Sequence, residues 1–126
     1  MTYEESLKII KNIQENKLTE QELMGYLCSE NTPIYILSNT IIQLCILKIE
    51  TQEIVQELEK ITKRMSSKDE YGAGMKVGHL AIAALGVINT DEAKKKYNKA
   101  HTLLEESEQA RIIGLIEMIK GIIKEK

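Results

Sequence analysis

The sequence of 126 residues contains no tryptophan, no phenylalanine, a single proline and two cysteines. Without Trp or Phe, isoleucine and leucine must supply most of the buried area. Apolar residues still make up 43% of the chain, which is enough for one domain with a hydrophobic core. One proline and seven glycines leave little loop material. This composition predicts an all-α protein with tight turns.

The two cysteines belong to no metal-binding or redox motif. Cys28 and Cys45 lie among apolar residues, and neither is part of a CxxC. Cysteines in such surroundings usually act as small buried hydrophobes, and a reducing cytosol is then the expected setting. At the level of the sequence, the alternative that the two thiols pair stays open.

The chain also lacks a strong net charge and a long apolar run. Its formal net charge of −2 argues against a general nucleic-acid-binding protein, because such proteins normally carry a basic surface. Residues 1–10 carry acids where a signal peptide needs a basic flank. The most apolar segments, residues 34–49 and 80–88, fall short of the roughly 20 apolar residues that span a membrane. We therefore expect a soluble, cytoplasmic protein without membrane contact.

Apolar residues that recur every three or four positions predict a series of amphipathic helices. Polar residues in front of several of them are typical N-caps. The expected helices cover residues 3–15, 19–29, 33–49, 51–65, 70–88, 91–104 and 107–125. The expected caps are Thr19 with Glu22, Thr32 before Pro33, Ser67 with Glu70, and Ser107.

Two segments carry more specific expectations. The helix at residues 33–49 is apolar over much of its circumference, so we place it centrally, with Ser38, Asn39 and Gln43 on a narrow solvated edge. Residues 71–78, YGAGMKVG, suggest a phosphate loop, but this spacing matches neither the dinucleotide fingerprint nor a Walker A motif. We interpret the segment as the start of a helix whose glycines permit close helix packing.

An internal repeat relates the third and fourth helices to the fifth and sixth. Residues from 38 onward align with those from 77 onward at an offset of 39, without a gap across the turn. Four of the pairs are identical, and the other three keep apolar character. The pairs are Ile41 with Leu80, Ile46 with Leu85, Ile49 with Ile88, Thr51 with Thr90, Glu53 with Glu92, Leu58 with Tyr97, and Lys60 with Lys99. Such a period predicts stacked helix pairs, with units at residues 3–29, 33–66 and 70–106 and a terminal helix at 107–125.

One part of the chain resembles a HEAT repeat, or its armadillo and PBS-lyase-like relatives. The residues that carry the resemblance are Ala81-x-x-Ala84-Leu85-Gly86, a short turn, Asp91-Glu92-Ala93, and a next helix opening Ser107-Glu108-Gln109-Ala110-Arg111. The resemblance implies a right-handed α-α superhelix of about seven helices, whose second helices line a concave binding side. The chain departs from the family at Gly78, where a basic residue is usual, and the helix at residues 33–49 lacks the Ala/Gly pattern.

The second helices of the middle units carry the candidate binding surface. Their positions opposite the core form a ridge across two repeats, with Lys60 and Lys99 in register. The run at residues 94–96 is the strongest charge cluster, although pairs from Asp91 to Lys95 and from Glu92 to Lys96 would neutralise part of it. An ordinary solvated helix face is the alternative. The candidate partner-binding residues are Gln52, Gln56, Lys60, Lys63, Lys95, Lys96 and Lys99.

No residue pattern predicts a reaction, a metal or a cofactor. His79 and His101 are the only histidines, and we expect both to be structural. Glu53 and Glu57 lie one turn apart, but on a face followed by lysines, as in many solvated helices. We therefore predict a protein that is not an enzyme and that uses no cofactor.

The leading functional hypothesis is a protein-protein interaction module whose basic concave strip binds a partner with an acidic surface. The small size suits an inhibitor, an immunity protein or a regulatory subunit, and the composition, rich in Ile and Lys, is compatible with a bacterial origin. The alternative is a HEAT-like nucleic-acid-binding protein that uses the patch at residues 94–99. A third possibility is structural, with the first and last helices assembling a homodimer rather than leaving a monomer.

Overall fold

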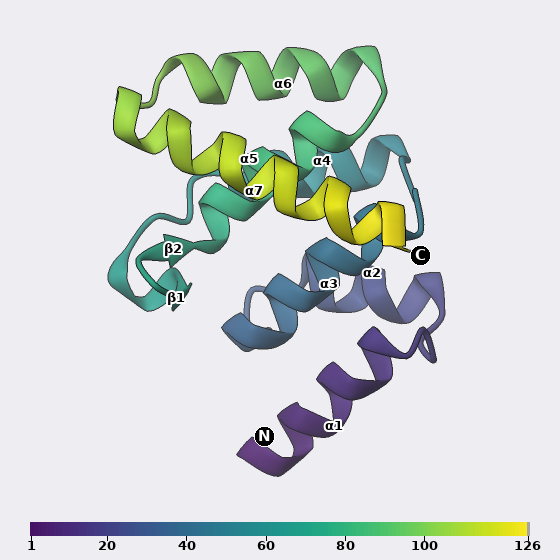
Figure 1. Ribbon diagram of the computed structural model, residues 1–126. Helices are drawn as coiled ribbons and strands as arrows, with labels where there is room; N and C mark the ends of the chain where they lie inside the picture. Colours follow the sequence, from purple (N-terminus) through teal and green to yellow (C-terminus); the bar gives the residue numbers. More distant parts are fainter. Residues whose placement is uncertain (126) are drawn as a thin grey trace.

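The computed structural model describes residues 1–125 and confirms an all-helical protein, with one small hairpin between two of the helices (Figure 1). The helices are α1 (Tyr3–Gln14), α2 (Glu20–Cys28), α3 (Ile34–Ile46), α4 (Gln52–Ile61), α5 (Val77–Val87), α6 (Asp91–Thr102) and α7 (Glu106–Glu125). A 3-10 helix η1 (Ser67–Asp69) and an antiparallel pair, β1 (Glu70–Gly72) and β2 (Met75–Lys76), connect α4 to α5. Within the described chain, no helix is both long and apolar enough to cross a membrane.

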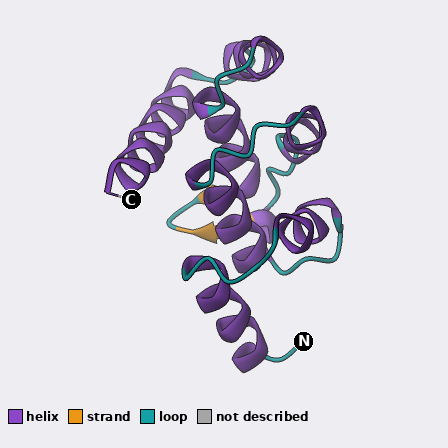
Figure 2. Cartoon of the chain, turned by 90° about the vertical axis from the view of Figure 1, so that its right-hand side faces the viewer, coloured by secondary structure: helices purple, strands orange, loops and turns teal. Residues whose placement is uncertain are grey.

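The helices lie in two layers. One layer holds α1, α3, α5 and α7, in which α3 contacts the other three and α5 also contacts α7. The second layer holds α2, α4 and α6, in which α4 contacts both neighbours. Figure 2 views these last three helices nearly end-on, in a column beside the first layer. The candidate binding residues lie along the layer of α2, α4 and α6.

Helix α5 forms the centre of the core and allows its neighbours to approach closely. All its residues from Val77 to Leu85 are buried. At Gly86, an added Cβ would lie 2.7 Å from the ring of Tyr97 on α6 and 2.8 Å from Cδ1 of Ile116 on α7. A helical glycine costs about 1 kcal/mol relative to alanine, and here the tight approach of two helices explains it. Among the glycines of the predicted helix at residues 70–88, Gly86 therefore permits the expected close helix packing.

Threonines begin all three helices of the second layer. The hydroxyl of Thr19 accepts the Glu22 N–H, and the Glu22 carboxylate accepts the Thr19 N–H, which confirms the predicted capping box. Thr51 and Thr90 cap α4 and α6 through the same kind of hydroxyl contact. The two threonines that align at the offset of 39 therefore occupy the same structural position.

The turns before α4 and α6 are joined directly. The main-chain N–H of Asn89 donates to Oε2 of Glu50 at 3.2 Å, and the two residues are 39 positions apart. This separation equals the offset of the internal repeat. A side chain in one helix-pair joint therefore satisfies a main-chain donor in the equivalent joint of the next pair.

Two predicted caps are wrong because the residues have other roles. Thr32 donates its hydroxyl to the carbonyl of Tyr26, so it ties the linker to α2, and α3 begins after Pro33 without a side-chain cap. Helix α7 already begins at Glu106, which places Ser107 inside its first turn. Helices α3 and α4 also end a few residues before the predicted positions.

The predicted pair of Ser67 and Glu70 is also wrong by one residue. The main-chain N–H and the hydroxyl of Ser66 both donate to Oδ2 of Asp69, at 3.1 and 2.8 Å. Arg64 donates from Nε to the other carboxylate oxygen at 3.1 Å. Asp69 is buried, with 4% of its side chain exposed. This carboxylate therefore holds Arg64 and Ser66 together in the connection between α4 and the hairpin.

The predicted helix at residues 70–88 is wrong in its first third. Gly72, Ala73 and Gly74 have φ angles of 143°, 51° and 79°, which a right-handed helix excludes and a tight hairpin turn requires. Helix α5 begins only at Val77. The glycines that suggested a helix start therefore shape the turn of a hairpin.

The predicted solvated edge of α3 is wrong as well. Ser38 and Gln43 are only 4% and 5% exposed, and Asn39 is half-buried. Ser38 donates to the carbonyl of Tyr35 at 3.0 Å, and Gln43 donates to Oδ1 of Asn16 at 3.4 Å. Helix α1 and the turn after it contact α3 at Asn39 and Gln43, and the polar side chains of α3 have hydrogen-bond partners rather than being solvated.

Candidate binding surface

Helices α4 and α6 are linked across the surface by an ion pair. Nζ of Lys96 lies 3.0 Å from Oε2 of Glu59, and the two side chains are 31% and 36% exposed. A pair this exposed contributes at most about 1 kcal/mol. The pairs expected within α6, from Asp91 to Lys95 and from Glu92 to Lys96, do not form; Lys96 instead joins the two neighbouring helices.

A groove of about 240 Å³ lies between α4 and α6, and we call it the α4–α6 groove. Its apolar lining includes the buried Ile82 and Leu85 of α5 and the half-buried Met65 and Leu104. Charged side chains border this apolar surface. They are Glu59, Lys63, Lys96 and Lys99.

Leu103, also in the lining of this groove, is the most exposed large apolar side chain of the protein's described part, at 80%. The sequence analysis missed it, because the apolar positions expected to face the core at residues 91–104 are Ala93, Tyr97, Ala100 and Leu104. Leu103 lies outside this pattern, and its apolar character at an outward position was the available signal. An exposed leucine beside an apolar groove is typical of a contact surface rather than of a solvated helix end.

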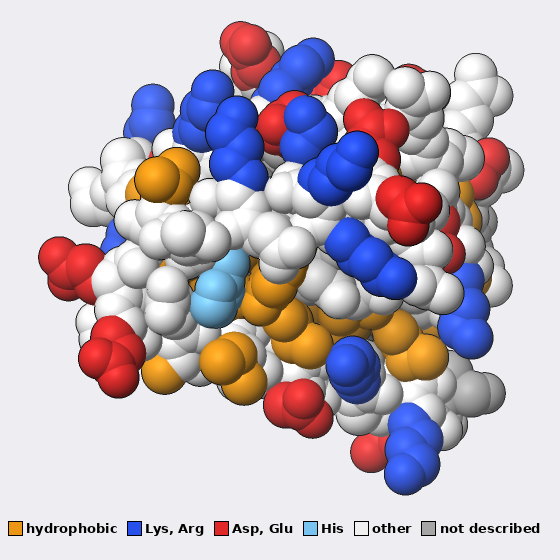
Figure 3. Space-filling view, turned by 90° about the horizontal axis from the view of Figure 1, so that it is seen from above, with side chains coloured by type: hydrophobic (Ala, Val, Ile, Leu, Met, Phe, Trp, Pro, Cys, Tyr) orange, Lys and Arg blue, Asp and Glu red, His pale blue; other side chains and the backbone are white. Residues whose placement is uncertain are grey.

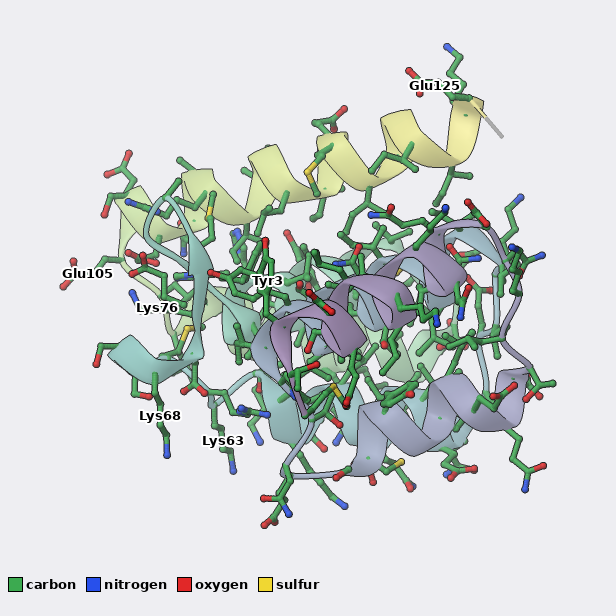
Figure 4. All side chains as sticks on the ribbon, turned by 90° about the horizontal axis from the view of Figure 1, so that it is seen from below. Tyr3, Lys63, Lys68, Lys76, Glu105 and Glu125 are labelled. Carbon is green, nitrogen blue, oxygen red and sulfur yellow. The ribbon has the colours of Figure 1, made fainter. Side chains whose placement is uncertain are left out.

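The structure brings three of the candidate residues together around the α4–α6 groove: Lys63 from the end of α4, and Lys96 and Lys99 from α6. Lys63 projects outward from the end of α4 (Figure 4). Figure 3 shows Lys and Arg side chains gathered with carboxylates over the α6 side of the molecule. Lys95 is exposed on α6 but does not line the groove.

The remaining candidates lie elsewhere on α4. Lys60 faces a second groove, of about 720 Å³, between α2 and α4, which we call the α2–α4 groove. Its Nζ lies 3.0 Å from Oε1 of Glu57, and this hydrogen bond raises the pKa of Lys60. Gln52 and Gln56 are exposed and line neither groove. The offset alignment of Lys60 with Lys99 therefore does not place the two ammonium groups in one groove.

The charges around the α4–α6 groove are unbalanced. Lys96 is neutralised by Glu59, whereas Lys63 and Lys99 have no carboxylate oxygen within 4.0 Å among the described residues. The groove therefore presents two uncompensated positive charges beside apolar side chains, one just after the end of α4 and one on α6.

The two thiols differ in environment and are both free. Cys28 is exposed in the α2–α4 groove, where partial desolvation and then the nearby carboxylates of Glu57 and Glu53 raise its pKa. Cys45 is buried, and desolvation raises its pKa to about 12. Neither thiol is in an electropositive setting that would produce a reactive thiolate.

His79 holds α5 to α7 and has no free ring nitrogen. Its Nδ1 accepts the Lys76 N–H at 3.0 Å, its Nε2 contacts the carboxylate of Glu108, and its side chain is 5% exposed. His101 stacks on Tyr97 with ring centroids 5.2 Å apart. Across residues 1–125, no three His, Cys, Asp or Glu side chains gather closely enough to hold a metal ion.

Comparisons with protein-family models, curated proteins and solved structures found no match. The α4–α6 groove combines an apolar lining, an exposed leucine, and two lysines with no carboxylate partner in the described part of the chain.

Proposed function

We propose that this protein is a non-enzymatic interaction module that binds a partner protein through the layer of α2, α4 and α6, centred on the α4–α6 groove. The observation that carries this proposal is the position of Lys63 and Lys99 beside an apolar groove whose lining includes Leu103. An apolar centre with a charged border is the usual anatomy of a protein-protein contact. The unpaired lysines favour a partner with an acidic surface.

The proposed architecture is a right-handed α-α superhelix of the HEAT or armadillo type. The two-layer packing, the equivalent caps at Thr51 and Thr90, and the bond from Asn89 to Glu50 support it, since each relates one helix pair to the next. In such a stack, α2, α4 and α6 line the concave side, where solenoid proteins usually bind. This places the α4–α6 groove on the proposed binding side.

The proposed role of such a module is that of an inhibitor, an immunity protein or a regulatory subunit. A bacterial cytoplasm is the proposed setting, and the free thiols of Cys28 and Cys45 are in keeping with a reducing compartment. The identity of the neighbouring gene tests this assignment. An adjacent toxin gene would favour the immunity protein, and a neighbouring enzyme gene would favour a regulatory subunit.

The charge-reversed double variant Lys95→Glu/Lys99→Glu tests the binding surface. Pull-downs from the native cell with wild-type protein as bait should retain a partner that the variant loses, because like charges across an interface repel. The matched control is Lys120→Glu/Lys124→Glu, which makes the same change in charge on the exposed side of α7. Circular dichroism should show equal helix content in all three proteins. Equal retention of the partner by both variants would contradict the proposed surface.

A second candidate function is nucleic-acid binding by the patch at residues 94–99. It is supported by Lys94, Lys95 and Lys99, which lack ion-pair partners in the described chain. The net charge of −2 opposes it. Retention on a DNA column that falls steeply with salt would support this function, and no retention at low salt would eliminate it.

Self-association is a third candidate. Tyr3 and Leu7 on α1 are 78% and 47% exposed, and Ile113 on α7 is 53% exposed. A second copy of the chain can cover such end faces in a homodimer. Sedimentation equilibrium distinguishes a dimer from the monomer that the leading proposal uses.

A further inference from the structure

We infer that the α4–α6 groove binds a short segment of a partner chain in which an apolar side chain is flanked by carboxylates. This inference rests on the proposed function and adds the chemistry of the bound segment.

The groove is smaller than a typical small-molecule site and suits a few side chains. Its volume of about 240 Å³ lies below the roughly 300–1,000 Å³ of typical small-molecule sites. Its lining combines apolar side chains with polar ones, and the polar ones are Glu59, Thr62, Lys63, Lys96 and Lys99. One or two apolar side chains of a protein segment fit this lining.

The charged side chains at the border of the groove determine which charges the bound segment should carry next to its apolar side chain. Glu59 and Lys96 neutralise one another at 3.0 Å, and their contact leaves the charges of Lys63 and Lys99 uncompensated. Lys63 lies just after the end of α4 and Lys99 lies on α6, so both sides of the groove can contact carboxylates of the bound segment. The methylene stems of lysines also extend an apolar surface up to the charged groups. Carboxylates next to an apolar side chain are therefore the complementary pattern.

Leu103 gives the groove an apolar contact outside the core. It is 80% exposed, and it follows directly after the last turn of α6, which carries Lys99. Energetically important interface residues are usually apolar anchors surrounded by polar contacts that exclude water. A bound apolar side chain can lie between Leu103 and the half-buried Met65 and Leu104, and bring its neighbouring carboxylates to the lysines.

A nucleic acid fits this groove less well than an acidic protein segment. The carboxylate of Glu59 lies in the groove wall and neutralises the charge of Lys96. The apolar lining does not contribute to the binding of a phosphate backbone, because the affinity for such a backbone depends on the number of cations that contact it. Competition by DNA is accordingly an outcome that the experiment must include.

The probe for the experiment is a phage-displayed library of random linear peptides, selected on the immobilised full chain. Sequencing should show enrichment of peptides with a leucine, isoleucine, phenylalanine or methionine that has aspartate or glutamate on both sides. The enriched peptides should bind Lys63→Glu/Lys99→Glu about tenfold or more weakly than the wild type, and this loss should shrink as salt rises. Leu103→Ser should also weaken them.

Two controls keep this result specific to the groove. Lys120→Glu/Lys124→Glu changes the net charge equally on α7 and should bind the peptides as the wild type does. Lys63→Gln/Lys99→Gln removes the charges without reversing them and should give an intermediate loss. Thermal unfolding of each variant identifies any that fails to fold. If Lys63→Glu/Lys99→Glu does not fold, Lys63→Gln/Lys99→Gln takes its place in the binding measurement.

The inference is overturned if no peptide is enriched, if the enriched peptides lack acidic residues, if Lys63→Glu/Lys99→Glu binds them unchanged, or if a DNA oligonucleotide displaces them. Such a result is distinguishable from failure of the proposed function. A native partner that is still lost on charge reversal of Lys95 and Lys99 would uphold the interaction surface and reject only the chemistry assigned to the α4–α6 groove.

Discussion

Lys96 on α6 contacts Glu59 on α4, with 3.0 Å between Nζ and Oε2. The two residues belong to different helix pairs, so the contact crosses the boundary between units of the predicted repeat. It also fixes one wall of the α4–α6 groove and removes one of the three lysine charges there. The pair therefore affects both the packing of the second layer and the charge that a partner meets.

The first prediction concerns the energy of this contact. In a double-mutant cycle with Lys96→Ala and Glu59→Ala, the coupling energy should be about 0.2–1 kcal/mol and should fall at high salt, because both side chains are partly exposed. Urea unfolding of the two single variants and the double variant measures it. Lys94→Ala serves as the control and should not couple to Glu59. A coupling of zero at low salt would contradict the contact.

The second prediction concerns the close approach at Gly86. Gly86→Ala should lower the free energy of unfolding by about 1–3 kcal/mol, because the new methyl group meets Tyr97 and Ile116. The matched control is Gly121→Ala on α7, where a Cβ meets nothing within 4 Å. That substitution should stabilise the protein by about 0.5–1 kcal/mol. Thermal or urea unfolding compares the two, and effects of the same sign would refute the packing at Gly86.

Sequence patterns predicted the helices well where local signals and packing agree. Thr19, Thr51 and Thr90 each precede an amphipathic helix, and the structure places a cap at all three. The hairpin was missed because its turn depends on positive φ angles that include Ala73, a residue that usually favours a helix. Burial of Gln43 was missed because its partner, Asn16, lies in the turn after α1, and periodicity along one helix cannot reveal such a partner.

The candidate site was only partly accessible from the sequence for a similar reason. The offset of 39 aligns Lys60 with Lys99, but the two residues line different grooves. A linear alignment gives positions along each helix, whereas the neighbour of a side chain depends on how adjacent helices are rotated and shifted. Lys96 therefore contacts Glu59, and this contact could not be inferred from spacing within α6.

The third prediction concerns pH and Asp69. Burial raises the pKa of Asp69, but the hydrogen bonds from Ser66 and Arg64 outweigh it and hold the pKa below its usual value. The resulting stabilisation is complete above the unfolded pKa of about 3.9 and is lost as pH falls through the lower folded value. Asp69→Asn should therefore cost about 1–3 kcal/mol at neutral pH, and the difference from the wild type should narrow in acid.

Urea unfolding across a pH series measures this effect. Glu117→Gln on the exposed face of α7 is the control, and its stability should follow that of the wild type at every pH. A constant difference between Asp69→Asn and the wild type down to the acid limit would show that the carboxylate charge has no part in holding the turn.

The fourth prediction concerns the two thiols. At mildly alkaline pH, a disulfide reagent should modify Cys28 in the native protein and leave Cys45 unmodified until the chain unfolds, because Cys45 is buried and its pKa is raised to about 12. Cys28 should react more slowly than a simple thiol. Glu57→Gln should accelerate it, since that carboxylate contributes to its raised pKa. Absorbance of the released thiolate gives both rates, and rapid release from two thiols in the native state would contradict the burial of Cys45.

The hairpin between α4 and α5 also gives the chain a natural place to be divided. The connection from α4 to α5 covers residues 62–76, whereas every other connection between helices has five residues or fewer. A break after Gly72, at the exposed turn, leaves all seven helices whole, with α1 to α4 in one fragment and α5 to α7 in the other. The contacts of α5 with α3 and α4 then become the interface between two separate polypeptides. Fragments expressed together should reassemble without a covalent link, and their association would report directly on the packing of the central helix.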